Sequence, residues 1–98
     1  MSGSPAARAV IRDIGTLLAP IGLSEIGVGG GGADVGPIAQ AANAPTMAYL
    51  GEPQKYFQIH HTPADTVERI APDEVSKAAA AVAVMIYMVA EMPERLPR

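Results

Sequence analysis

Cysteine and tryptophan are absent from this chain of 98 residues, and phenylalanine occurs only once. Without cysteine, neither a disulfide framework nor a thiolate zinc site is possible. Hydrophobic residues still make up 49% of the chain, but most of them are alanines and valines, which bury little area each. We therefore expect a shallow core, or one that depends on surfaces outside this chain.

A cluster of basic residues is also missing. The net charge is −3 and the isoelectric point is about 5.2. No stripe of lysine and arginine is present to neutralise phosphates, so nucleic acid is excluded as a partner.

The longest apolar run, Ala78–Ala90, has about 13 residues, short of the roughly 20 that cross a bilayer. Met1–Ser4 lacks the basic and apolar regions of a secretory signal and reads as a cloning scar or an arbitrary start. The sequence assigns no compartment, although the lack of cysteine is compatible with an exported or periplasmic enzyme.

Three helices are predicted from the spacing of apolar residues and from their caps. The first covers Ser4–Ala19, with Pro5 in its first turn and apolar residues at helical spacing. These apolar residues are Val10, Ile14, Leu17 and Leu18. The second follows Asp34 as its N-cap and ends near Asn43, before a proline. The third covers Pro72–Met92 and begins with two acidic residues, which suit the N-terminal end of a helix dipole.

The segments between the helices are predicted to be strands and loops. Leu23–Val28 and Thr46–Leu50 read as short strands, and a run of glycines follows the first of them. Gly51–Thr66 shows neither a helical nor a strand period, so it is predicted to be a loop, and a loop of this length suggests a function. Residues 93–98 are predicted to be a frayed tail.

The last helix is apolar around most of its circumference. One face consists of Val75, Ala79, Val82, Ile86 and Val89, and Val84, Met85 and Met88 extend the apolar surface. Such a helix requires burial on two sides. Because so short a chain offers few surfaces to cover the second side, we expect self-association or a homo-oligomer.

The predicted loop carries both histidines, in the sequence His60-His61-Thr62-Pro63-Ala64-Asp65-Thr66. A neutral imidazole is a good zinc ligand when its second nitrogen is held by a partner. Asp65 could cap the turn through its backbone or support an imidazole. On spacing alone, two surface histidines in a polar loop are the better interpretation. Tyr56 could pack as an anchor or present its hydroxyl to the site, and the sequence does not separate the two.

The run of glycines from Gly27 to Gly32 invites a second interpretation, as a phosphate-binding loop. The Walker lysine and the acidic residue of a dinucleotide site are both missing. Asp34, at the start of the next helix, would repel a phosphate. Phosphate binding is therefore rejected, and no serine lies in the glycine context of a catalytic nucleophile.

Three blocks of the sequence occur in an order and at spacings that carry a resemblance to a known family. They are Gly29–Asp34 with Val35–Ile38 and Asn43–Pro45, then Tyr56–Thr66, then Ile70–Val75 with the helix behind it. Together they resemble the bacterial leucyl aminopeptidases and the plasma glutamate carboxypeptidases, which are two-zinc exopeptidases, and they are most similar to the second branch. The resemblance covers nearly the whole chain.

The resemblance implies roles for individual residues. In this family, the histidine directly before a Thr-x-x-Asp-Thr pattern is a zinc ligand, which corresponds to His61. His60 would support that ligand or face the substrate, and Asp65 would orient the loop. Asp34 corresponds to an aspartate near the substrate pocket.

The resemblance also implies a fold and an activity. Residues 1–98 would form a single partial domain, the C-terminal part of an α/β, three-layer αβα sandwich with about three helices and two or three short strands. The whole enzyme would hydrolyse peptide bonds at chain ends with two zinc ions. Its other metal ligands and its catalytic glutamate would lie upstream, so this chain is expected to be inactive alone. The alternative is a non-catalytic, homo-oligomerising interaction module derived from that fold.

Overall fold

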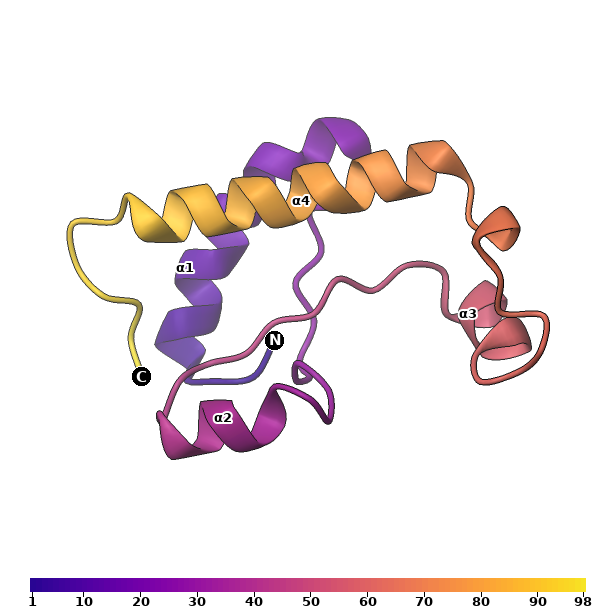
Figure 1. Cartoon of the computed structure of the whole chain (residues 1–98). Helices are drawn as coiled ribbons and strands as arrows, with labels where there is room; N and C mark the ends of the chain where they lie inside the picture. The colour runs from indigo at the N-terminus through magenta and orange to yellow at the C-terminus, as the bar shows by residue number, and fades with distance from the viewer.

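A computed structural model describes all 98 residues as helices joined by extended segments and turns, without strands (Figure 1). The elements in chain order are α1 (Pro5–Gly15), the 3-10 helix η1 (Thr16–Ile21), α2 (Gly36–Ala41), α3 (Pro53–Ile59), the 3-10 helix η2 (Val67–Arg69) and α4 (Pro72–Ala90). The predicted α/β fold class is therefore wrong, because the structure is all-helical. The molecule is flat, with extents of 43 × 33 × 19 Å. None of its helices combines the length and the apolarity needed to cross a membrane.

Helix α1 begins where the sequence predicts. The Ser4 side chain accepts a hydrogen bond from the backbone N–H of Ala7 at 3.1 Å, and Pro5 occupies the first turn. This arrangement satisfies one of the free N–H groups of a helix start. The α-helix ends at Gly15, earlier than expected, and continues as the tighter η1, which contains Pro20. Gly22 closes this segment in the left-handed conformation, with φ of 75°.

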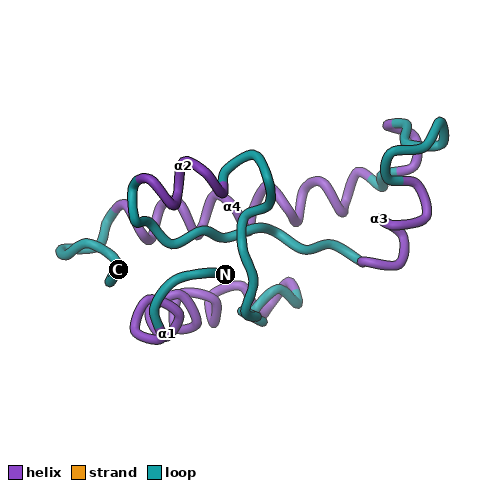
Figure 2. Tube along the Cα trace, turned by 90° about the horizontal axis from the view of Figure 1, so that it is seen from below, coloured by secondary structure: helices purple, strands orange, loops and turns teal.

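The core forms where α1, which η1 continues, packs against α4, and the chain consists of helices and loops alone (Figure 2). Its buried apolar residues are Met1, Ala7, Ile11, Ile14, Leu18, Ala81 and Met85. Only eight of the 98 residues are buried, in agreement with the shallow core expected from the composition. Met92 and Leu96, beyond the end of α4, also pack against this cluster.

The two predicted strands are extended segments that do not pair with each other. The N-terminal residues contact both: the Met1 amino group donates to Gly27 O at 2.7 Å, and the Ser2 N–H donates to Thr46 O at 2.8 Å. Thr46 N–H in turn donates to the Ser2 hydroxyl at 2.8 Å. No backbone hydrogen bond reaches residues 47–51. A strand requires a continuing ladder of such bonds, and isolated bonds to the N-terminus do not make one.

Replacing Gly3 with alanine tests this packing of the N-terminus. Gly3 has φ of 104°, and an added Cβ would lie 2.7 Å from the Cβ of Pro45. We expect Gly3→Ala to lower the free energy of unfolding by about 1–3 kcal/mol, because the backbone strain and the clash add. Urea denaturation, monitored by circular dichroism, measures this loss in the free energy of unfolding. Gly22→Ala, with positive φ and no neighbour within 4 Å, is the control and should cost less. Equal losses would mean that Gly3 does not pack against Pro45.

Candidate functional site

The segment that carries the histidines contains a helix that the sequence analysis missed. Helix α3 begins at Pro53, with Glu52 as its N-cap. Proline at the first position of a helix was the available signal, but seven residues are too few to show a helical period. The helix lies at the end of α4 that begins at Pro72, away from both chain termini (Figure 1).

A tight turn follows α3 and displays His61. The His61 backbone is in the left-handed region, with φ of 57°, which is uncommon for a residue other than glycine. Behind it, the Thr62 hydroxyl donates to Ile59 O at 2.6 Å, and the Asp65 N–H donates to Thr62 O at 3.0 Å. The loop is thus closed by its own hydrogen bonds. Asp65 takes part through its backbone, while its exposed carboxylate makes no hydrogen bond.

Three aromatic rings lie together at this turn. The hydroxyl of Tyr56 and Nε2 of His60 are 3.0 Å apart, within hydrogen-bonding distance. Their rings stack, with centroids 4.3 Å apart and planes 24° apart. The ring of His61 lies 3.8 Å from that of His60, tilted by 54°. Tyr56 therefore turns its hydroxyl toward the histidines instead of acting as a buried anchor, and His60 is held between Tyr56 and His61.

Charged residues connect α3 to α4. The ammonium of Lys55 lies 3.0 Å from a carboxylate oxygen of Glu74 and 3.2 Å from one of Glu52. The hydrogen bond that the Lys55 ammonium donates to Glu74, followed by the one that it donates to Glu52, raises the pKa of Lys55 above its ordinary value. The three side chains are exposed, so each ion pair stabilises the fold only weakly. The Lys55–Glu74 pair joins α3, which precedes the histidine turn, to the first turn of α4.

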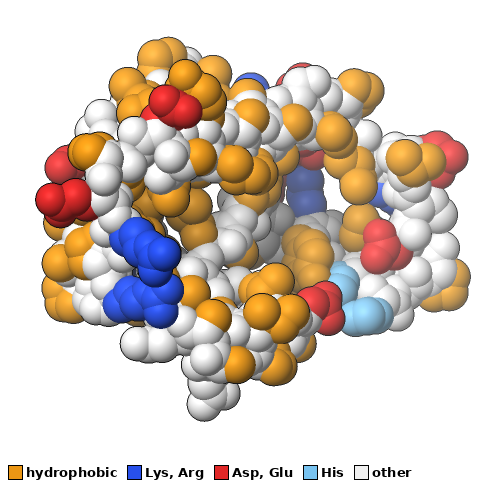
Figure 3. All heavy atoms as spheres, turned by 60° about the vertical axis from the view of Figure 1, so that its left-hand side comes forward, with side chains coloured by type: hydrophobic (Ala, Val, Ile, Leu, Met, Phe, Trp, Pro, Cys, Tyr) orange, Lys and Arg blue, Asp and Glu red, His pale blue; other side chains and the backbone are white.

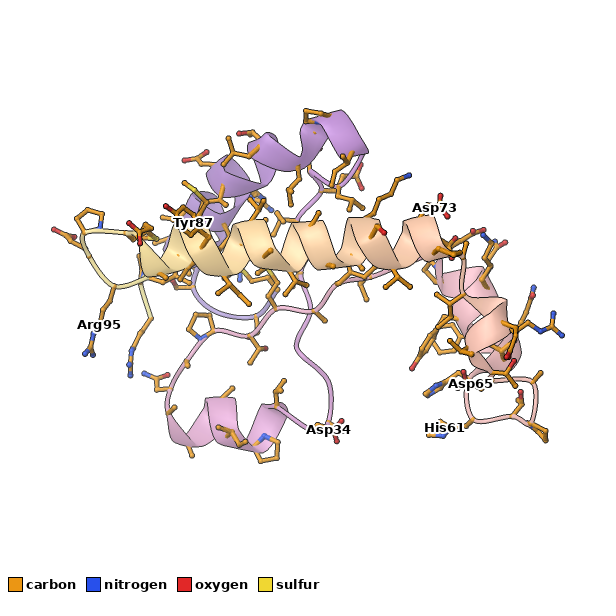
Figure 4. The ribbon with its side chains drawn as sticks, turned by 45° about the horizontal axis from the view of Figure 1, so that its top comes forward. Asp34, His61, Asp65, Asp73, Tyr87 and Arg95 are labelled. Carbon is orange, nitrogen blue, oxygen red and sulfur yellow. The ribbon has the colours of Figure 1, made fainter.

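Asp34 lies in another part of the molecule. It is exposed in the turn before α2, whereas His61 and Asp65 lie together beside α3 (Figure 4). Val35, and not Asp34, is the N-cap of α2, so the predicted capping role of Asp34 is wrong. A hollow of about 410 Å³ lies beside α2, lined among others by Ser2, Gln40 and Arg98, and neither histidine lines it.

The donor set of this chain does not fit a zinc ion by itself. No group of three or more histidine, aspartate or glutamate side chains lies close enough together to hold a metal. A catalytic zinc requires about three protein ligands. His61 presents an exposed imidazole, while the Nε2 atom of His60 faces Tyr56. The chain supplies one free imidazole, with Asp65 four residues away on the same loop.

Several curated proteins are similar to this chain along nearly its whole length. Carboxypeptidase Q of Homo sapiens is 37% identical over 97 residues, which are 99% of this chain and 20% of the human protein. The proteins of the same name from Mus musculus and Xenopus laevis are 36% and 34% identical over the same coverage. No protein-family model matches the chain, and no solved structure does. The chain spans about one fifth of the length of these relatives, and the resemblance to the plasma glutamate carboxypeptidases is confirmed: the chain is homologous, over its whole length, to part of carboxypeptidase Q.

Proposed function

We propose that this chain is the C-terminal segment of a zinc-dependent exopeptidase of the carboxypeptidase Q type, to which it contributes His61 as a zinc ligand. The observation that carries the proposal is the homology over 97 residues at 37% identity. In the whole enzyme, two zinc ions would activate a water for attack on a peptide bond at a chain end. This chain would supply one ligand and part of the substrate pocket.

The geometry of the turn supports the assignment of His61 over His60. The Nε2 atom of His60 is within hydrogen-bonding distance of Tyr56, whereas the exposed ring of His61 has no hydrogen-bond partner. Because a partner usually orients a ligating imidazole, the rest of the enzyme would have to supply that partner for His61. In this assignment, the ring of His60, which stacks on Tyr56, lies beside the ring of His61 and limits how that ring can turn. Asp65 would orient the loop, and Asp34 would lie on the substrate side only once the rest of the enzyme is present.

A second candidate is a non-catalytic module that forms homo-oligomers. The observation that favours it is the number of large apolar side chains left exposed, including Phe57 at 75% and Ile86 at 66%. Exposed apolar patches commonly mark interaction surfaces. The homology to a carboxypeptidase is explained without assuming a non-catalytic module, so the enzyme segment is the better-supported proposal. Turnover by a protein that contains this segment would separate the two.

The isolated chain should show no peptidase turnover when zinc is added. The expected reason is the shortage of ligands, because the chain holds no group of three metal-binding side chains and a catalytic zinc needs about three. Dipeptides and amino-acid amides incubated with the pure chain and zinc would be followed by chromatography. Product formation above a heat-denatured sample would contradict this prediction.

A further inference from the structure

Helix α4 carries two apolar stripes, and only one of them has a partner within this chain. The first stripe, which includes the buried Ala81 and Met85, packs against α1. The second consists of Val75, Ala79, Val82 and Ile86, which we call the open stripe. Its three larger side chains are 52%, 45% and 66% exposed. The open stripe follows the helical spacing of four, three and four residues.

The open stripe continues onto neighbouring residues. Val67 and Ile70, on η2 and just after it, are 76% and 46% exposed. Together with Val75 they line a largely apolar hollow of about 550 Å³ beside the start of α4. No charged residue occurs in α4 after Lys77. Figure 3 shows hydrophobic side chains exposed over much of one face of the molecule, with acidic and basic side chains interspersed among them.

The area left exposed exceeds that of a compact monomer of the same mass. The accessible surface is 7197 Å², whereas a compact monomer of 10.1 kDa exposes about 5,300 Å². The excess of about 1,900 Å² matches one side of an obligate interface, which buries about 1,000–2,500 Å² per partner. The radius of gyration of 14.7 Å likewise exceeds the roughly 12.6 Å of a compact chain of this length.

We propose that the open stripe is the surface by which this segment packs against the remaining four fifths of a carboxypeptidase Q-length protein. The inference rests on the proposed function, because the occupant is the rest of that enzyme. Two observations favour this occupant: about four fifths of the relative's length lies outside the part that this segment matches, and the excess area is of the obligate class. The third side of α4, with Asp73, Lys77 and Glu91, would remain in solvent.

The test is co-purification of this chain with tagged human carboxypeptidase Q that lacks the segment matching it. We expect the wild-type chain to bind and Ile86→Asp to bind about 30-fold more weakly, as for a buried interface anchor. Val82→Asp should behave like Ile86→Asp. Ala80→Asp places the same charge on the polar side of α4 and should bind like wild type. Far-UV circular dichroism checks that each variant retains its helices, which is expected because the three side chains are exposed.

Failure of the wild-type chain to co-purify, or equal binding by Ile86→Asp, would overturn the inference. So would a discrete homodimer of the chain that Ile86→Asp abolishes and that does not bind the truncated enzyme, since the occupant would then be a second copy. Zinc-dependent carboxypeptidase turnover by the complex is measured separately. A complex that depends on Ile86 but lacks turnover would leave the interface standing and count against the proposed function alone.

Discussion

Replacing His61 with alanine should remove zinc and activity from a hybrid enzyme in which this chain replaces the matching segment of human carboxypeptidase Q. Loss of an outer residue that only supports a ligand costs about 10–100-fold in metal affinity or activity. Loss of a ligand itself should cost at least about 100-fold. The expected result for His61→Ala is therefore a fall of turnover by at least that factor, together with a lower zinc content by atomic absorption.

The matched control is His60→Ala, which removes the same side chain one residue earlier. Because the Nε2 atom of His60 faces the Tyr56 hydroxyl at 3.0 Å, we expect a smaller loss, of about 10-fold, with the zinc content retained. Tyr56→Phe should act in the same direction as His60→Ala. If His61→Ala keeps both zinc and turnover, or if His60→Ala is the more damaging change, the assignment of the ligand is wrong.

Replacing Ile11 with alanine should unfold the isolated chain far more readily than any other change of similar size. Ile11 is 1% exposed and is the largest side chain that is fully buried. Loss of a buried isoleucine to alanine costs about 2–5 kcal/mol, while a whole domain is stable by only about 5–15 kcal/mol. With eight buried residues in total, this chain should lie at the low end of that range. The urea midpoint, followed by far-UV circular dichroism, should fall sharply or disappear.

Leu17→Ala is the control for Ile11→Ala. Leu17 belongs to η1 and is 55% exposed, so its truncation should change the free energy of unfolding by no more than about 0.5 kcal/mol. Similar urea midpoints for the two variants would show that the packing of α1 against α4 does not stabilise the isolated chain.

The sequence predicted the long helices well and the apolar faces less well. Ile14 and Leu18 are buried as expected, but Leu17 is exposed and Ile11 was missed. The buried residues Ala7, Ile11, Ile14 and Leu18 recur at the spacing of four, three and four residues that places side chains on one helix face, and Leu17 lies off that face. On α4, the face predicted from Val75, Val82 and Ile86 is the exposed one, while Ala81 and Met85 meet α1.

The candidate site was predicted in part. The motif in the sequence predicts His60, His61 and Asp65 as site residues, and the structure places them on one closed turn. Their roles stay predictions, because a metal site depends on ligands from outside this chain. Helix α3 was not predicted because seven residues are too few to show either a helical or a strand period. The stacking of Tyr56 on His60 follows from that helix, which places residues four apart on the same side.

By itself, the sequence determined the start of α1, the extent of α4, the shallow core and, through its ordered motifs, the family. These features depend on local caps, on helical period and on composition, which the chain carries within short stretches. Only the tertiary structure decided that the extended segments do not form a sheet and that α4 has one covered stripe and one open stripe. Helical periodicity shows that a face is apolar, but only the presence of a partner in space decides whether that face is buried. His61 depends on both the sequence and the tertiary structure. The motif predicts it as a candidate zinc ligand, and the turn after α3 exposes its side chain.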